Sequence, residues 1–216
     1  MYKRQIVYLL LQLAFARVTL VTQANADALY PLSGEALAFR EDSMVLMLQD
    51  AILFPNAARI ARQICQQIYT YSSSTTGAVN DGAEDKERLW DDSRSKLVAT
   101  LRRRAGVAPD TVLPAIRLVV LDMTRVAHID ATGMQALADV RCFLKEWAGE
   151  KAELRFSGLN AELKERFSRA AQLFEVDQGR GRPRDAGDVV FDVLQTALEP
   201  PKAQQKSSVT EDSVAV

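Results

Sequence analysis

The residues best suited to chemistry lie together between Asp122 and Gly133, where the sequence reads DMTRVAHIDATG. His128 is the one histidine of the chain, and the acids Asp122 and Asp130 stand near it in sequence. An imidazole oriented by a carboxylate is a common general base, but no serine or cysteine stands nearby for it to activate. We therefore expect a structural histidine, and we expect the chain to carry no catalytic residues.

Thr132 stands where the apolar run that ends at Asp122 gives way to a helical pattern. Its hydroxyl could accept from the free amides of the first helical turn, which makes Thr132 a candidate N-cap. The same amides and the helix dipole favour a phosphate, whereas the charge of Asp130 opposes one. Thr132 is therefore also a candidate phosphorylation site, and the two interpretations stay open together.

Other enzyme and cofactor patterns are absent from the sequence. The chain has no G-x-S-x-G elbow, no G-x-x-x-x-G-K-[ST] phosphate loop and no H-E-x-x-H helix. Gly179-Arg180-Gly181 lacks the third glycine of a dinucleotide-binding turn and is typical of a loop. A single histidine is also too few for the usual zinc sets. We expect no metal site and no cofactor.

The composition is that of an ordinary globular protein with one core. The chain has 216 residues, of which 48% are hydrophobic and 25% charged. The 27 basic side chains nearly balance the 28 acidic ones, so the totals give no electrostatic reason to expect a nucleic-acid partner.

Apolar runs and helical periodicities alternate along the chain. Continuous or alternating apolar residues predict strands, and apolar residues at spacings of three and four predict helices, which start at cap-forming residues. The predicted strands are 44–48, 117–122 and 152–157, and the predicted helices run from Asn56 to Tyr69, from Gly133 to Gly149, from Asn160 to Phe174 and over Val189–Leu198. This alternation indicates an α/β layer fold.

The remaining segments look less ordered. Residues 1–21 contain an apolar run that fits a signal peptide, a membrane-edge helix or a buried helix equally well. Residues 22–43 are expected to be a linker, residues 71–96 a disordered insertion rich in Ser, Thr, Gly and acids, and residues 199–216 a disordered tail. One folded domain is thus expected over residues 44–198.

The stretch LVVLDMTRVAHIDATGMQAL resembles the signature of the STAS domain. This domain is shared by bacterial anti-sigma factor antagonists and by the cytoplasmic C-terminal part of SulP-type sulfate and anion transporters. The antagonists have a phosphorylatable Ser or Thr where this chain has Thr132, whereas Ala131 departs from their Asp-Ser-Ser/Thr-Gly pattern. The segment MVLMLQDAILFPNAARIARQI and the long insertion after it resemble the transporter branch.

The resemblance implies a STAS-type α/β layer fold, with a four- to five-stranded mixed sheet flanked by helices. It implies a cytosolic regulatory and protein-interaction module of a SulP-type transporter, associated with the membrane and facing the cytoplasm. The expected partners are the transporter membrane domain or other cytosolic proteins. Residues 1–21 would then be the remnant of the last membrane helix and could contact the membrane.

The same resemblance implies where the site lies. The expected switch or interaction residues are Asp130, Ala131, Thr132 and Gly133, with Asp122 and His128 as structural support of the turn. The family has also been linked to nucleotide binding, which would place a phosphate near the same helix N-terminus, although no motif here requires one. The alternative function is a free-standing partner switch regulated by phosphorylation of Thr132.

Overall fold

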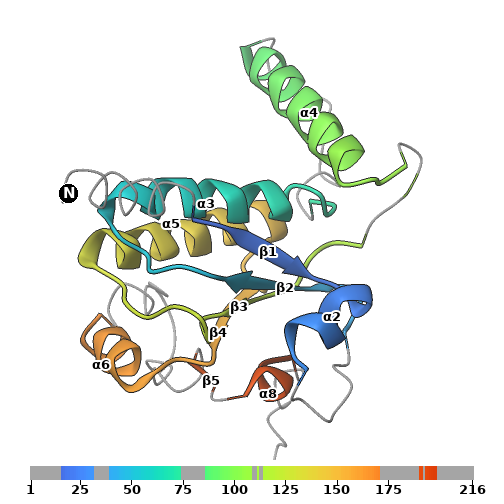
Figure 1. Ribbon diagram of the computed structural model, residues 1–216. Coiled ribbons are helices and arrows are strands. Elements are labelled where there is room, and N and C mark those ends of the chain that lie inside the picture. The colour runs from blue at the N-terminus through green and yellow to red at the C-terminus, as the bar shows by residue number, and fades with distance from the viewer. Residues whose placement is uncertain are drawn as a thin grey trace, which may run out of the picture.

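The structure is a computed structural model that describes residues 16–31, 39–73, 86–108, 111, 114–170, 190–191 and 193–198. Strands and helices alternate along the chain (Figure 1). The strands are β1 (Val18–Val21), β2 (Ser43–Leu48), β3 (Leu118–Asp122), β4 (Glu153–Ser157) and β5 (Val190–Phe191). The helices are α2 (Gln23–Leu29), α3 (Phe54–Ile68), α4 (Lys86–Arg104), α5 (Ala131–Ala148), α6 (Ala161–Arg169) and α8 (Leu194–Leu198).

The strands form one five-stranded mixed sheet in the order β1-β2-β3-β4-β5. β1 is antiparallel to β2, and the other three pairs of neighbours are parallel. Parallel neighbours need crossover connections, and α3, α5 and α6 lie in these connections. The sheet confirms the predicted α/β class and the predicted four- to five-stranded mixed sheet.

The sheet is covered on both faces. α3 and α5 lie side by side on one face, and α2 and α8 lie on the other (Figure 1). Successive residues of a strand point to opposite faces, so β2 contributes Met44, Leu46 and Leu48 to the larger core and Val45 and Met47 to the smaller one. This two-sided burial explains why β2 and β3 read as continuous apolar runs.

The N-terminal part of the chain differs from the prediction. Val18–Val21, expected at the end of a membrane-helix remnant over residues 1–21, is an edge strand of the sheet. The expected linker over residues 22–43 contains α2, whose Ala26 is buried in the smaller core. The β-branched and apolar residues of Val18–Val21 favour a strand. They follow an apolar run directly, so they were assigned to the same segment as that run. Residues 1–15 lie outside the described residues.

The outer edge of β1 is covered by side chains of the chain itself. The register with β2 turns the backbone groups of Val18, Leu20 and Thr22 away from the sheet. The Val18 amide donates to Gln63 Oε1 at 3.2 Å. Asn25 accepts from the Thr22 amide at 2.7 Å and donates to the Leu20 carbonyl oxygen at 2.9 Å. Edge strands that keep such groups unpaired invite pairing with other chains.

The insertion also differs from the prediction. It was expected to be disordered over residues 71–96, but the chain from Lys86 onward forms α4. The Arg102 guanidinium in the last turn of α4 donates to the carbonyl oxygens of Thr70 at 3.1 Å and Tyr71 at 3.2 Å, which follow the end of α3. These bonds join the end of α4 to the segment that follows α3. Residues 74–85 lie outside the described residues.

Two further boundaries are corrected. The predicted helix over Val189–Leu198 is divided into the short strand β5 and the five-residue helix α8. Asn56, predicted as the N-cap of α3, lies inside its first turn, and the N-cap is Leu53. Asn56 Oδ1 accepts from the Leu53 amide at 2.8 Å, so this side chain still stabilises the start of the helix. The prediction that Asn160 caps α6 is confirmed.

Candidate functional site at the Asp130 turn

The turn at Asp130 joins the loop after β3 (residues 123–130, the β3–α5 loop) to the start of α5. Asp130 is the last extended residue, with φ −96° and ψ 179°, and its Oδ1 accepts from the Gly133 amide at 2.7 Å. Asp130 is therefore the N-cap, and the prediction that Thr132 caps the helix is wrong. Thr132 is the second residue of α5, and its side chain is exposed.

The second oxygen of Asp130 serves a different helix. Asp130 Oδ2 accepts from the Phe54 amide, the first of α3, at 2.6 Å. One carboxylate thus bonds to the N-terminal amides of both α3 and α5. Each helix N-terminus carries a partial positive charge, so the negative charge of Asp130 is stabilised by two dipoles at once.

Gly133 allows the close approach of α5 to the chain that precedes α3. A Cβ at this position would lie 2.7 Å from the Ile52 carbonyl oxygen and 2.8 Å from Ile129 Cγ1. Ile52 and Ile129 also form a parallel bridge, and the Asp130 amide donates to the Ile52 carbonyl oxygen at 3.0 Å. A larger side chain would push α5 away from this bridge.

Asp122 lies at the other end of the loop and bonds to its second residue. It is 1% exposed, and it accepts from the Thr124 amide at 2.9 Å, from the Thr124 hydroxyl and from the Tyr30 hydroxyl. Burial, and next the hydrogen bond to Asp122, raise the pKa of Tyr30 far above its ordinary value. The phenol therefore remains a donor at every physiological pH. This contact ties α2 to the end of β3.

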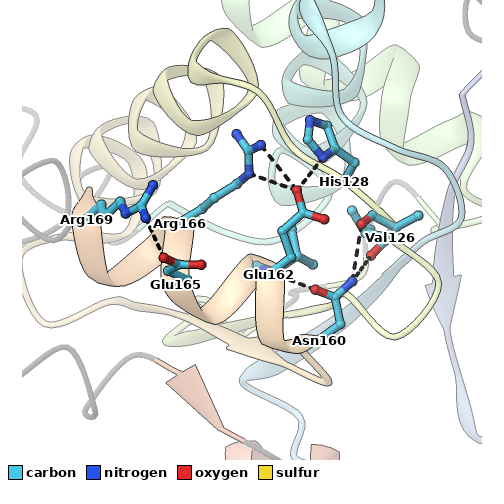
Figure 2. Close-up of polar contacts among 9 residues, drawn as sticks. Val126, His128, Asn160, Glu162, Glu165, Arg166 and Arg169 are labelled. Atoms are coloured by element: carbon cyan, nitrogen blue, oxygen red, sulfur yellow. Dashed lines mark hydrogen bonds and ion pairs between the residues drawn. The ribbon is translucent and has the colours of Figure 1, made fainter.

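His128 lies in the middle of the loop and contacts α6. Its Nδ1 is 2.7 Å from Glu162 Oε1, and Arg166 Nε lies 3.2 Å from the same oxygen (Figure 2). The hydrogen bond from His128 is the main cause that holds the pKa of Glu162 below its ordinary value, and Arg166 adds to it. The structure does not join His128 to Asp122 or Asp130, the two acids considered as its partners from sequence.

Asn160 holds the same loop from the first turn of α6. Its Oδ1 accepts from the Leu163 amide at 2.8 Å, and its Nδ2 lies 3.3 Å and 3.2 Å from the carbonyl oxygens of Val126 and Ala127 (Figure 2). The cap was predicted from the sequence, whereas the bonds to the loop were not. No local sequence signal marks such bonds, because their partners lie more than thirty positions away.

The exposed side chains at this corner come from two helices. Phe54 is 75% exposed, and Pro55, Ala131 and Thr132 are exposed beside it. We call these four residues the turn surface. Ala131 and Thr132 were predicted from the sequence, whereas Phe54 and Pro55 were not, because they belong to another helix. The switch or interaction role of the turn itself stays a prediction.

Comparison with known proteins relates the chain to a protein family. The model of the STAS domain matches residues 36–183, which include the Asp130 turn. Two relatives from Schizosaccharomyces pombe are Probable sulfate permease C3H7.02, 30% identical over 66% of this chain, and Probable sulfate permease C869.05c, 24% identical over 54% of it. The matched regions span 15% and 13% of the length of these relatives.

Two solved structures share the fold. SLC26A9 superposes with a TM-score of 0.53 at 14% identity, over 91% of this chain and 26% of that protein. The murine Slc26a9 anion transporter in its inward-facing state gives a TM-score of 0.50 at 13% identity, over 90% of this chain and 23% of that protein. Among the described residues, none of the helices has the length and apolar character needed to cross a bilayer. The match of the family model over most of the chain shows that it belongs to the STAS domain family.

Proposed function

We propose that this chain is a regulatory, protein-binding module of a SulP-type transporter for sulfate or a related anion, and that it faces the cytoplasm and performs no catalysis. The observation that carries the proposal is the turn surface: an exposed apolar side chain, Phe54, stands beside Thr132 on two helix ends that one carboxylate holds together. Exposed aromatic side chains on a rigid base are typical anchors of protein interfaces. The names of the two S. pombe relatives support sulfate as the transported anion.

The expectation of no catalysis is supported by the contacts of the titratable groups. Asp130 bonds to the Phe54 and Gly133 amides, and His128 contacts Glu162. Among the described residues, neither group is bonded to the Thr132 hydroxyl, so neither is placed to activate it. The partner is therefore expected to bind the turn surface rather than react there, and the membrane domain of the transporter is the partner we propose first.

The proposal is tested in the S. pombe relative C3H7.02. The segment of that permease that matches this chain is replaced by the chain, in cells that lack their own sulfate permeases, and uptake of labelled sulfate is measured. The swapped permease should transport more sulfate than a permease from which the segment is deleted. Phe54→Ser should lower uptake, whereas Gln135→Ser, at another exposed site on α5, should not.

A control for expression is needed, because a permease that fails to reach the membrane also fails to transport. Surface labelling gives the amount at the plasma membrane, and uptake is expressed per labelled molecule. Equal uptake per molecule for the swapped and the deleted permease would contradict the proposal.

A second candidate function is a partner switch controlled by phosphorylation of Thr132. The observation that favours it is that Asp130 caps α5, which leaves the exposed Thr132 hydroxyl uninvolved in capping. A phosphate on Thr132 would meet the positive end of α5 and the negative charge of Asp130 together. Incubation of the chain with lysate and ATP, followed by mass spectrometry, tests this. An unmodified Thr132 together with unchanged partner binding would exclude the switch.

A further inference from the structure

The β3–α5 loop is held at its ends by the backbone and in its middle by α6. At one end the Met123 amide donates to the Ser157 carbonyl oxygen of β4 at 2.9 Å, and the Val126 amide donates within the loop to the Met123 carbonyl oxygen at 2.9 Å. At the other end the Ile52 amide donates to the His128 carbonyl oxygen at 2.9 Å. Between these ends, the first turn of α6 contacts the loop (Figure 2). Asn160 bonds to the carbonyl oxygens of Val126 and Ala127, and Glu162 bonds to the His128 side chain.

We infer that the first turn of α6 positions the Asp130 turn, with Asn160 as one support and the Glu162–His128 contact as a second. This inference rests on the proposed function, because it assigns the regulation of the same turn surface. It makes Asn160 and Glu162 positioning residues: they act on the turn through the loop and touch none of the four residues of the turn surface in the described contacts.

Asn160 performs two tasks with two different atoms. Its Oδ1 caps α6, and its Nδ2 donates toward the carbonyl oxygens of Val126 and Ala127. An aspartate in its place would still cap the helix, but it would offer two acceptors and no donor to the loop. Asn160→Asp therefore separates the two tasks: α6 keeps its cap, and the loop loses its support.

The second support depends on charge. When His128 is protonated, its contact with the Glu162 carboxylate is charge-assisted; when it is neutral, the contact survives only with the proton on Nδ1. From α6, Arg166 shares the same Glu162 oxygen, and from the loop itself the charge of Asp130 is directed to the Phe54 and Gly133 amides. Removal of the charge of Glu162 should therefore weaken this support.

The size of this second support is limited by exposure. The His128 and Glu162 side chains are 40% and 51% exposed, so solvent screens their attraction. We expect its loss to raise the population of the open loop about two- to threefold. Loss of the two Asn160 bonds should have the larger effect, about fivefold or more.

Hydrogen exchange of the full chain, followed by NMR, tests the inference. The reporting amides are those of Phe54 and Gly133, which bond to Asp130, and the Leu163 amide reports the cap of α6. Asn160→Asp should lower the protection factors of the first two amides about fivefold and leave that of Leu163 unchanged. Unchanged protection at Phe54 and Gly133, or an equal loss at Leu163, would overturn the inference.

Two more variants complete the test. Asn160→Ser also caps a helix but is too short to reach the loop, so it should reproduce the result if Asn160→Asp fails to fold. Glu162→Gln keeps a hydrogen-bonding side chain without the charge. It should lower the protection factors of the Phe54 and Gly133 amides about two- to threefold, and protection equal to that of the parent chain would overturn the role of the second support.

The outcomes separate this inference from the proposed function. Exchange is measured on the chain without a partner, so it reports the support by α6 whether or not the chain regulates a transporter. If Asn160→Asp loosens the turn while the swapped permease transports no better than the deleted one, the support is real and the proposed function is wrong. If the swapped permease transports and Asn160→Asp leaves the turn unchanged, only the inference fails.

Discussion

The shared cap at Asp130 gives the sharpest prediction of stability. Asp130→Ala removes the acceptor of the Gly133 amide in α5 and that of the Phe54 amide in α3. Loss of an N-cap side chain costs about 0.5–2 kcal/mol, and loss of a negative charge costs about 0.3–1 kcal/mol at each helix N-terminus. Because the Phe54 amide is exposed to water once released, we take the lower part of these ranges for α3. The expected loss is about 2–4 kcal/mol of the free energy of unfolding.

Asp130→Asn is the informative partner of this variant. Asparagine has one acceptor oxygen, so it can bond to the Gly133 amide or to the Phe54 amide but not to both. Its side chain is neutral, and the interaction with both helix dipoles is lost as well. Asp130→Asn should therefore lose about 1–2 kcal/mol, between the parent chain and Asp130→Ala.

Two matched variants serve as controls. Asn160→Ala removes the cap of one helix and its two long bonds to the loop, and should lose about 1–2 kcal/mol. Thr132→Ala alters an exposed side chain that caps nothing, and should change stability by less than about 0.5 kcal/mol. Urea unfolding at neutral pH, followed by circular dichroism, gives the free energy of unfolding of each variant and so ranks them. If Asp130→Ala loses no more than Thr132→Ala, or if Asp130→Asn equals the parent chain, the shared cap is refuted.

The remaining predictions concern other contacts of the site. Gly133→Ala should destabilise the chain by about 1–3 kcal/mol in urea unfolding, because its Cβ would lie 2.7 Å from the Ile52 carbonyl oxygen, and a neutral or stabilising result would contradict the close approach. Tyr30→Phe removes a donor from the buried Asp122 carboxylate and should cost about 1–3 kcal/mol, and a thermal midpoint equal to that of the parent would speak against this bond. The pKa of Glu162 is lowered from its ordinary value of 4.5, so its contribution to stability is present above that pH and is lost as pH falls through the lowered pKa. The stability difference between the parent and Glu162→Gln should shrink on acidification, and a difference that stays constant from neutral pH to pH 3 would exclude the contribution.

The elements of the core followed from local patterns in the sequence. The isoleucines of α3 recur every four residues, and the β3 run is apolar on both faces, so periodicity alone placed the helix and the strand. Asn160 was recognised as a cap because one cap-forming residue stands before one apolar stripe. At the start of α5, by contrast, Asp130 and Thr132 are both cap formers two positions apart, and the sequence does not tell which of them is the last extended residue.

The contacts that complete the site could not be predicted in this way. The bond of Tyr30 to Asp122 joins residues 92 positions apart, and that of Phe54 to Asp130 joins residues 76 apart. Such pairs depend on how the layers of the fold come together, which helical and strand periodicity does not encode. The strand β1 was missed for a related reason: four residues carry little periodicity, and their pairing with β2 became visible only in the sheet.

The covered edge of β1 limits how this domain can meet other proteins. Asn25 and Gln63 occupy backbone groups that a sixth strand, added beside β1, would need, so strand addition would first have to break contacts within the chain. Recognition at this edge is therefore disfavoured, and so is the edge-to-edge stacking that leads to aggregates. A domain whose β1 edge is covered in this way resists self-association through that edge at high concentration, and contacts with other proteins there depend on side chains rather than on backbone pairing.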